Sequence, residues 1–139
     1  MITELTRMWL TRSTKPFLFK NEYDQELPFS DCDGLGLYVH IPFCRSICSF
    51  CPYCKTLYTE EACSQYIDAL IREIHLAGSQ APGKKTVTNL YFGGGTPALA
   101  ADRIKEIIDA IQEHFIITQG IGIELHPENV TPRTLHILK

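Results

Sequence analysis

The chain has 139 residues, of which 45% are hydrophobic and 21% charged, a composition typical of a single globular domain with its own core. Thirteen basic and 16 acidic residues give a formal net charge of −3, which excludes the basic surface expected of a nucleic-acid-binding protein. The apolar runs are shorter than the roughly 18 residues that a membrane-spanning helix needs, so we expect a cytoplasmic protein with no membrane span.

The first 34 residues are predicted to form an N-terminal extension that packs on the outside of the domain. Their hydrophobic period is mixed, and they end in a turn near Asp33-Gly34. The first 15 residues lack the apolar core and small-residue cleavage site of a signal peptide. We therefore expect the folded domain to cover residues 35–139.

The domain opens with a predicted strand and a predicted helix. "LGLYVHI" (35–41) is rich in β-forming residues, and a cysteine-rich loop follows it. Residues 60–77 are expected to form a helix, with Gly78 as its stop. The buried face of this helix is predicted to carry Ile67, Leu70, Ile71 and Ile74.

The same order of strand and helix then repeats twice. A strand over 86–92 is followed by "GGGTP" and by an amphipathic helix over 99–115. A third strand over 120–125 is followed by the loop "HPENV" and by a helix whose N-cap is Thr131, with Pro132 at its first position. Helical crossovers of this length predict a parallel sheet.

The predicted fold class is therefore α/β, built from parallel βα repeats. Three strands leave both edges of a parallel sheet open. We interpret the chain as the first part of a larger βα barrel or a truncated gene product, and a small complete three-layer domain is the alternative.

Four of the six cysteines lie within one short segment. Cys44, Cys48 and Cys51 follow the spacing C-x3-C-x2-C, which lets one loop supply three thiolates to an iron–sulfur cubane and leaves its fourth iron open. Structural zinc usually takes two ligand pairs separated by a longer spacer. Cys54 is either a fourth ligand, as in an electron carrier, or a nearby thiol that does not bind. Cys32 and Cys63 are expected to be buried, unreactive thiols.

Two further motifs follow the second and third strands. Gly93, Gly94 and Gly95 allow the backbone to approach a ligand closely, although a tight turn requires glycine equally. Glu124 ends an apolar strand and needs a partner or solvent there. Because parallel strands end at one edge of a sheet, the three motifs should surround one shared space. Tyr38 and His40 are predicted to share one face of the first strand, and His40 and His126 are individually weak candidates.

The motifs resemble a known family. "CRSICSFC" is similar to the cysteine signature of the radical S-adenosylmethionine enzymes. "YVHIPFC", "YFGGGTP" and "IELHPENVTP" resemble, more narrowly, the oxygen-independent coproporphyrinogen III oxidase group, which also contains haem chaperones and anaerobic haem-degrading methyltransferases. The resemblance covers residues 35–139 and implies the N-terminal half of a partial (βα)6 TIM-like barrel.

The resemblance also implies site residues. Cys44, Cys48 and Cys51 would ligate a [4Fe–4S] cluster, whose open iron would bind S-adenosylmethionine. The other cofactor-binding residues would be Tyr38, Phe50, Gly93, Gly94, Gly95, Thr96 and Glu124, with Phe50 beside the adenine and Thr96 at the methionine carboxylate. Tyr38 and Glu124 are also the candidate catalytic residues.

The implied activity is reductive cleavage of S-adenosylmethionine to a 5′-deoxyadenosyl radical that acts on a tetrapyrrole-like substrate, with flavodoxin or ferredoxin as electron donor. One departure is that Pro52-Tyr53 separates Cys51 from Cys54, where the oxidases have a single residue. This spacing favours a relative with another substrate. The alternatives are a haem chaperone with His40 or Cys54 as haem ligand, a four-cysteine ferredoxin-like carrier, and a zinc-binding interaction module.

Overall fold

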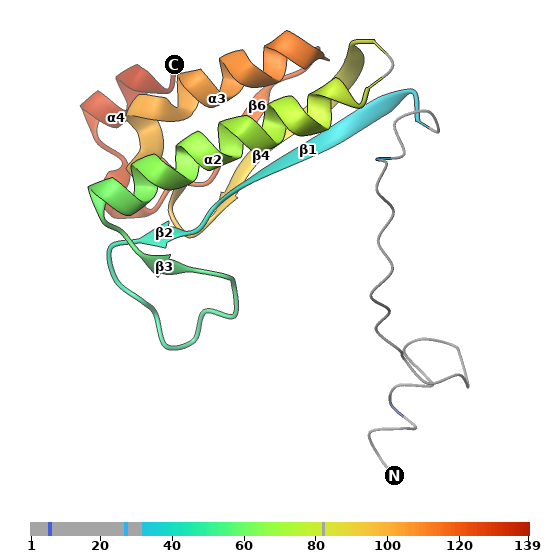
Figure 1. Cartoon of the computed structure of the whole chain (residues 1–139). Helices are drawn as coiled ribbons and strands as arrows, with labels where there is room; N and C mark the ends of the chain where they lie inside the picture. Colours follow the sequence, from blue (N-terminus) through green and yellow to red (C-terminus); the bar gives the residue numbers. More distant parts are fainter. Residues whose placement is uncertain (1–5, 7–26, 28–31, 82) are drawn as a thin grey trace.

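The computed structural model describes Thr6, Leu27, residues 32–81 and residues 83–139 (Figure 1). Most of the predicted extension therefore lies outside the described residues, and its packing stays a prediction. The elements follow in the order β1 (Gly34–Ile41), β2 (Phe43–Cys44), β3 (Thr56–Leu57), α2 (Glu60–Ser79), β4 (Lys85–Gly94), the 3-10 helix η2 (Pro97–Ala100), α3 (Ala101–His114), β5 (Phe115–Ile117), β6 (Ile121–Ile123), the 3-10 helix η3 (Pro127–Asn129) and α4 (Pro132–Ile137).

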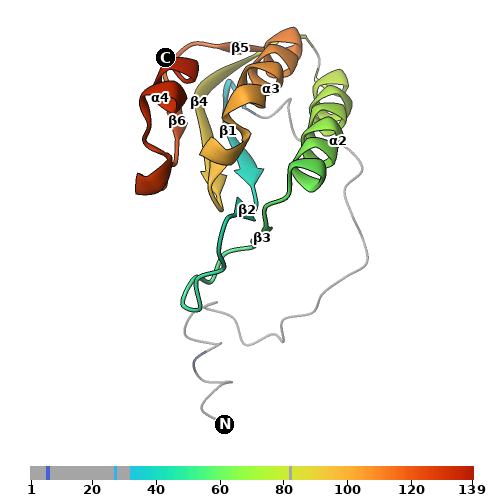
Figure 2. The ribbon, with the colours of Figure 1, turned by 90° about the vertical axis from the view of Figure 1, so that its left-hand side faces the viewer.

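The main sheet is parallel, as predicted, with β4 between its neighbours. β1 pairs with β4 along its whole length, from Gly34 opposite Thr86 to Ile41 opposite Gly94. On the other side of β4, β5 pairs with Lys85–Val87 and β6 pairs with Leu90–Phe92. β5 and β6 thus follow one another along the same edge of β4 (Figure 2).

The helices α2 and α3 pack side by side on one face of this sheet (Figure 2). The core between them is apolar, and its fully buried side chains include Ile41, Ile67, Val87, Leu90, Phe92, Ile107 and Ile111. Removing these side chains from water is the main stabilising contribution. In the described part of the chain, no helix combines the length and the hydropathy that crossing a bilayer requires.

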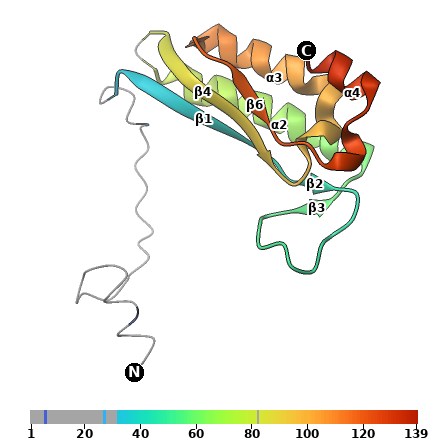
Figure 3. The ribbon, with the colours of Figure 1, turned by 180° about the vertical axis from the view of Figure 1, so that it is seen from behind.

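The opposite face of the sheet carries polar and aromatic side chains, because successive strand residues point to opposite faces. The Tyr38 hydroxyl lies 3.1 Å from His40 Nδ1 on β1, which confirms that these two residues share a face. The rings of Tyr38 and Tyr91 are stacked with centroids 6.4 Å apart. The described helices leave this face uncovered (Figure 3).

The start of α4 agrees with its predicted cap, and α2 starts with a cap of the same kind. The hydroxyl of Thr59 accepts a hydrogen bond from the Ala62 amide at 3.1 Å, and Glu60 and Glu61 lie in the first turn of α2. The hydroxyl of Thr131 accepts from the Thr134 amide at the start of α4. Each bond satisfies an amide that a helix start leaves without an intrahelical acceptor.

The structure corrects the predicted ends of both long helices. Gly78 does not stop α2, which continues to Ser79; Gly78 is buried inside the helix. The predicted helix over 99–115 begins with a 3-10 turn and ends at His114, and Phe115 starts strand β5 instead. Phe115 is buried in the strand, and a buried helix position would be equally apolar, so its hydrophobicity does not distinguish helix from strand.

Two smaller predictions concern cysteines. Cys63 is buried, as expected, and burial raises the pKa of its thiol. Cys32 is only half-buried, so the prediction that it is buried is wrong. It lies before the first strand, and its carbonyl oxygen accepts a hydrogen bond from Lys85 Nζ at 3.3 Å.

Candidate functional site

The three sequence motifs meet at one end of the sheet. The cysteine loop follows β1, the glycine motif ends β4, and "ELHPE" follows β6. Together they line a cavity of about 290 Å³, formed by Cys44, Arg45, Ser46, Cys48, Phe50, Cys51, Gly94, Gly95, Thr96, His126, Glu128 and Asn129. The predicted shared space is therefore present, and parallel strands explain it because their carboxyl ends meet at one edge.

The cysteine loop is closed at its base by a short strand pair that the sequence did not indicate. β2 and β3 pair in parallel, with Phe43 opposite Thr56 and Cys44 opposite Leu57. The Thr56 amide donates to the Pro42 carbonyl at 2.8 Å, and the Tyr58 amide donates to the Cys44 carbonyl at 2.9 Å. Figure 1 shows the loop projecting from the sheet beyond this pair. The strand pair fixes the backbone at Cys44.

The four loop cysteines differ in their position relative to the cavity. Cys44 and Cys51 are half-buried and Cys48 is exposed, and all three line the cavity. Cys54 is exposed and is not among the lining residues. Its carbonyl oxygen lies 3.0 Å from His40 Nε2, on the polar face of the sheet.

The sulfur atoms of the loop cysteines are spaced more widely than thiolates bound to a single metal ion. One tetrahedral zinc ion holds its thiolates about 4 Å from one another. Among the described residues, no three of these cysteines have sulfur atoms that all lie within 4.8 Å. A cubane binds each thiolate to a different iron and so accepts a wider spacing. Three thiols around one cavity therefore fit the donor set of an iron–sulfur cluster.

The glycine motif packs tightly against β1 and the cysteine loop. A Cβ atom on Gly93 would lie 2.8 Å from the Tyr38 ring, and one on Gly95 would lie 2.6 Å from the Phe43 carbonyl and 2.8 Å from Cys44 Sγ. Gly94 has a φ of 121°, which side chains rarely tolerate. The tight turn and its close packing are therefore sufficient to explain why these positions are glycine. Gly94 and Gly95 also line the cavity.

The amide groups that follow Gly93 are all engaged inside the protein. The Gly95 amide donates to the Ile41 carbonyl and the Thr96 amide to the Phe43 carbonyl, each at 2.8 Å. The Gly94 amide donates to Glu124 Oε2 at 3.3 Å. Thr96 itself is buried. The motif therefore offers close backbone approach, while these three amides already have acceptors.

Glu124 lies beside the glycine motif and is bound by two partners. Besides the Gly94 amide, the Tyr91 hydroxyl donates to Glu124 Oε1 at 3.2 Å. Loss of hydration, this hydrogen bond and the carboxylate charge raise the pKa of Tyr91. Loss of hydration and the Glu124 charge likewise raise the pKa of Tyr38. Glu124 does not line the cavity itself.

Several cavity residues carry weak sequence signals or none. His126 Nδ1 accepts a hydrogen bond from the Glu128 amide at 3.3 Å and so caps η3. Glu128 and Asn129 line the cavity because η3 turns them toward the cysteine loop. Phe50 is 86% exposed at the cavity edge. The position of "HPEN" directly after the third predicted strand was the sequence feature that indicated this side of the cavity.

A second cavity, of about 560 Å³, lies between β1 and α2. Its lining is mainly apolar, with Leu37, Leu70, Ile74 and Phe115 among its residues. Neither the cysteines nor the glycine motif lines it, so it is separate from the cysteine cavity. Tyr38 and His40, two of the predicted site residues, line this second cavity and not the cysteine cavity.

No protein-family model matches the chain. The chain is 44% identical over 91 residues to anaerobilin synthase of Escherichia coli O157:H7, a match that covers 64% of this chain and 20% of that protein. It is 40% identical over 110 residues to oxygen-independent coproporphyrinogen III oxidase of Helicobacter pylori (strain J99), with 75% of this chain and 24% of the relative covered. It is 31% identical over 104 residues to haem chaperone HemW of Lactococcus lactis subsp. lactis, with 73% and 26% covered.

A solved structure gives the same relationship. Coproporphyrinogen III oxidase (HemN) from Escherichia coli, described as a radical SAM enzyme, matches with a TM-score of 0.67 and 34% identity over 74% of this chain and 24% of that one. The chain spans between 20% and 26% of the length of these relatives. The chain belongs to the radical S-adenosylmethionine superfamily, in the group that contains oxygen-independent coproporphyrinogen III oxidase, and it corresponds to the N-terminal part of those proteins.

Proposed function

We propose that Cys44, Cys48 and Cys51 hold a [4Fe–4S] cluster and that S-adenosylmethionine binds the iron they leave open. The observation that carries this proposal is the division among the four cysteines. These three line one cavity with the glycine motif, and Cys54 lies outside it. A fourth thiolate from Cys54 would close the cluster and leave no position for a substrate.

The remaining residues bind and orient the cofactor in this proposal. When bound, the cluster supplies the electron for reductive cleavage of S-adenosylmethionine. The engaged amides of Gly94, Gly95 and Thr96 and the nearby Glu124 carboxylate favour a cationic ammonium group over a carboxylate at the motif. We therefore assign the methionine amine to this wall, in place of the carboxylate that the resemblance assigns to Thr96. The adenine is assigned to the exposed Phe50 ring.

We further propose that residues 35–139 form the N-terminal half of a partial barrel and residues 1–34 an extension outside it. The uncovered sheet face, with Tyr38, His40 and Tyr91, supports this proposal because polar side chains there suit a barrel interior that holds a substrate. The names of the relatives support a tetrapyrrole-like substrate. A flavodoxin or ferredoxin as electron donor and a cytoplasmic location complete the proposal.

Cluster assembly is tested by anaerobic reconstitution with iron and sulfide. We expect a broad absorbance near ~400 nm and about four irons per chain. Replacement of Cys44, Cys48 or Cys51 by serine should abolish both, and Cys54→Ser is the matched control that should retain them. Loss of the cluster in Cys54→Ser would instead identify a closed electron carrier.

Cofactor cleavage is tested with the reconstituted protein. Incubation with dithionite and S-adenosylmethionine should release 5′-deoxyadenosine, detected by liquid chromatography. The variant Cys51→Ser should release none. A cluster that forms fully but yields no 5′-deoxyadenosine would leave cluster binding intact and refute the proposed cleavage.

A haem chaperone is the second candidate, since the chain is also 31% identical to HemW proteins. His40 and Cys54 are its candidate haem ligands, and the contact between His40 Nε2 and the Cys54 carbonyl places them side by side. Titration with haem should then give a one-to-one complex that His40→Ala or Cys54→Ala weakens. Absence of a haem-binding isotherm would exclude this candidate.

A further inference from the structure

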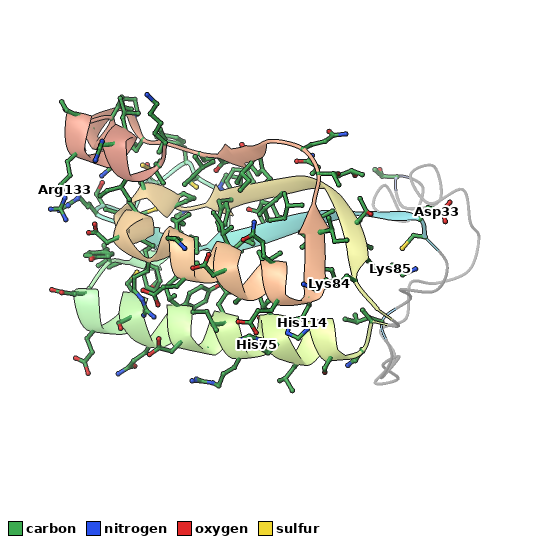
Figure 4. All side chains as sticks on the ribbon, turned by 90° about the horizontal axis from the view of Figure 1, so that it is seen from above. Asp33, His75, Lys84, Lys85, His114 and Arg133 are labelled. Carbon is green, nitrogen blue, oxygen red and sulfur yellow. The ribbon has the colours of Figure 1, made fainter. Side chains whose placement is uncertain are left out.

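A second group of metal-ligating side chains lies between the two long helices, away from the cysteine cavity. His75 belongs to α2, and Glu113 and His114 belong to the end of α3. Figure 4 shows His75 and His114 facing one another across the gap between these helices. Since the helices run antiparallel to the strands, their carboxyl ends lie at the edge of the sheet opposite the cysteine loop.

The three side chains converge on one point. His75 Nδ1 lies 3.0 Å from His114 Nε2 and 3.7 Å from Glu113 Oε2. Their ligand atoms all lie within 4.8 Å of one another, the one such group of histidine, cysteine or acidic residues among the described residues. A cation about 2.1 Å from each nitrogen fits between atoms at this spacing.

The ring of His114 is held in place by its surroundings. A Cβ atom on Gly78 would lie 2.3 Å from His114 Cγ, so glycine at this position of α2 makes room for the ring. The His114 and Phe115 rings also meet edge to face, with centroids 6.4 Å apart. Both histidines are half-buried. The rings therefore keep a fixed mutual orientation before any ligand arrives, which lowers the entropic cost of binding.

The hydrogen bonds within this group do not use all of its atoms. Two neutral imidazoles at 3.0 Å share a single proton, so one nitrogen donates and the other accepts. The Glu113 carboxylate is 65% exposed and approaches His75 only at ion-pair distance. A divalent cation would instead accept the lone pairs of both nitrogens and neutralise the carboxylate.

We propose that His75, Glu113 and His114 form a binding site for a divalent transition cation of the zinc class, which cross-links α2 to α3. Two imidazoles and one carboxylate are ligands that zinc, nickel and copper accept, and magnesium or calcium would require oxygen ligands. Three protein ligands leave one position of a tetrahedral ion for water. This site is independent of the proposed cluster, with which it shares no residue.

The test must separate this site from the cysteines, because free thiolates are themselves zinc ligands. We would use the full chain with Cys44, Cys48, Cys51 and Cys54 all replaced by serine and titrate it with zinc chloride by calorimetry. The site predicts binding of one zinc per chain and a rise in melting temperature. Addition of His75→Ala or His114→Ala should weaken binding at least about tenfold. The exposed His136→Ala on α4 is the matched control and should bind as before.

A cobalt spectrum and one exposed variant complete the test. Bound cobalt(II) should show visible bands without the near-ultraviolet charge transfer that thiolate ligands produce. Glu113→Gln, at an exposed position that the fold does not need, should also weaken binding. The proposal is overturned if the serine variant binds no zinc, or if all three site variants bind it as tightly as their parent.

Discussion

At the scale of single residues, the glycine motif connects the central strand to the cysteine loop. Gly95 approaches Cys44 Sγ and the Phe43 carbonyl so closely that no side chain fits between them. The position of the Cys44 thiol therefore depends on a residue that follows a different strand. Local sequence around the cysteines could not predict this contact, because it arises only when β1 and β4 pair.

Replacement of Gly95 by alanine should displace the cysteine loop. The added methyl group has no room, so we expect a loss of about 1–3 kcal/mol in the free energy of unfolding and a lower iron content after reconstitution. Gly36→Ala is the matched control, since a Cβ atom there meets nothing within 4 Å. Equal iron content in Gly95→Ala and Gly36→Ala would contradict the proposed contact.

The hydrogen bond from the Tyr91 hydroxyl to Glu124 is a second contact between single residues that can be tested. The pKa of Tyr91 is raised above its ordinary 10.0, so the folded protein holds the phenol proton more tightly than the unfolded chain does. This contribution to stability is complete below pH 10 and is lost as the pH rises through the folded-state pKa.

Removal of the carboxylate charge should lower the pKa of Tyr91. In Glu124→Gln we expect the phenol to titrate nearer to 10.0, measured by ultraviolet absorbance of tyrosinate against Tyr91→Phe as reference. An unchanged titration of Tyr91 in Glu124→Gln would show that Glu124 does not act on this hydroxyl.

At the scale of secondary-structure elements, tertiary contacts explain two features that the sequence pattern did not predict. Glycine often ends a helix, yet α2 continues through Gly78 to Ser79. A Cβ atom at this position would meet the ring of His114, which accounts for glycine there. The pairing of β2 with β3 was also missed, since two-residue strands have no periodic pattern. Tertiary contacts determine both features, and single-sequence patterns contain no information on them.

Gly78→Ala should therefore have the opposite effect from an ordinary helix substitution. Alanine usually stabilises a helix interior by about 1 kcal/mol relative to glycine. Here the methyl group meets His114, and we expect a lower melting temperature. The double variant Gly78→Ala/His114→Ala should recover stability beyond His114→Ala alone. A more stable single variant Gly78→Ala would contradict the packing.

Arg103 links the same two helices at their other end. Its guanidinium donates to Asp68 at 2.8 Å on α2 and to Glu106 at 2.6 Å on α3, and it also bonds Ser64. The hydrogen bond and charge of Arg103 hold the pKa of Glu106 below its ordinary 4.5. This stabilising contribution is complete above pH 4.5 and disappears as the pH falls through the folded-state pKa.

Arg103→Ala should lower the free energy of unfolding by about 1 kcal/mol at pH 7 in urea titrations, and the difference from the parent should shrink toward pH 3. Lys105→Ala removes an exposed pair with Asp109 and serves as the control, with a smaller loss. A difference for Arg103→Ala that stays constant down to pH 3 would exclude the Glu106 contribution.

At the scale of the whole molecule, the repeat of strand and helix was predictable, and with it the meeting of three motifs at one edge. Apolar stripes such as that through Ile67 and Ile74 and a cap such as Thr131 identify the elements, because local chemistry determines them. The sequence predicted where the cavity lies but not which residues line it. Glu128 and Asn129 enter it through η3, and Cys54 lies outside it, and both facts depend on loop geometry.

The open iron proposed between Cys44, Cys48 and Cys51 can be tested by spectroscopy. We would record the electron paramagnetic resonance spectrum of the dithionite-reduced, reconstituted protein before and after addition of S-adenosylmethionine. We expect the signal of a reduced [4Fe–4S] cluster whose g-values change when the compound binds, in the parent and in Cys54→Ser alike. A signal that S-adenosylmethionine leaves unchanged, or one that disappears in Cys54→Ser, would contradict an iron left open by three cysteines.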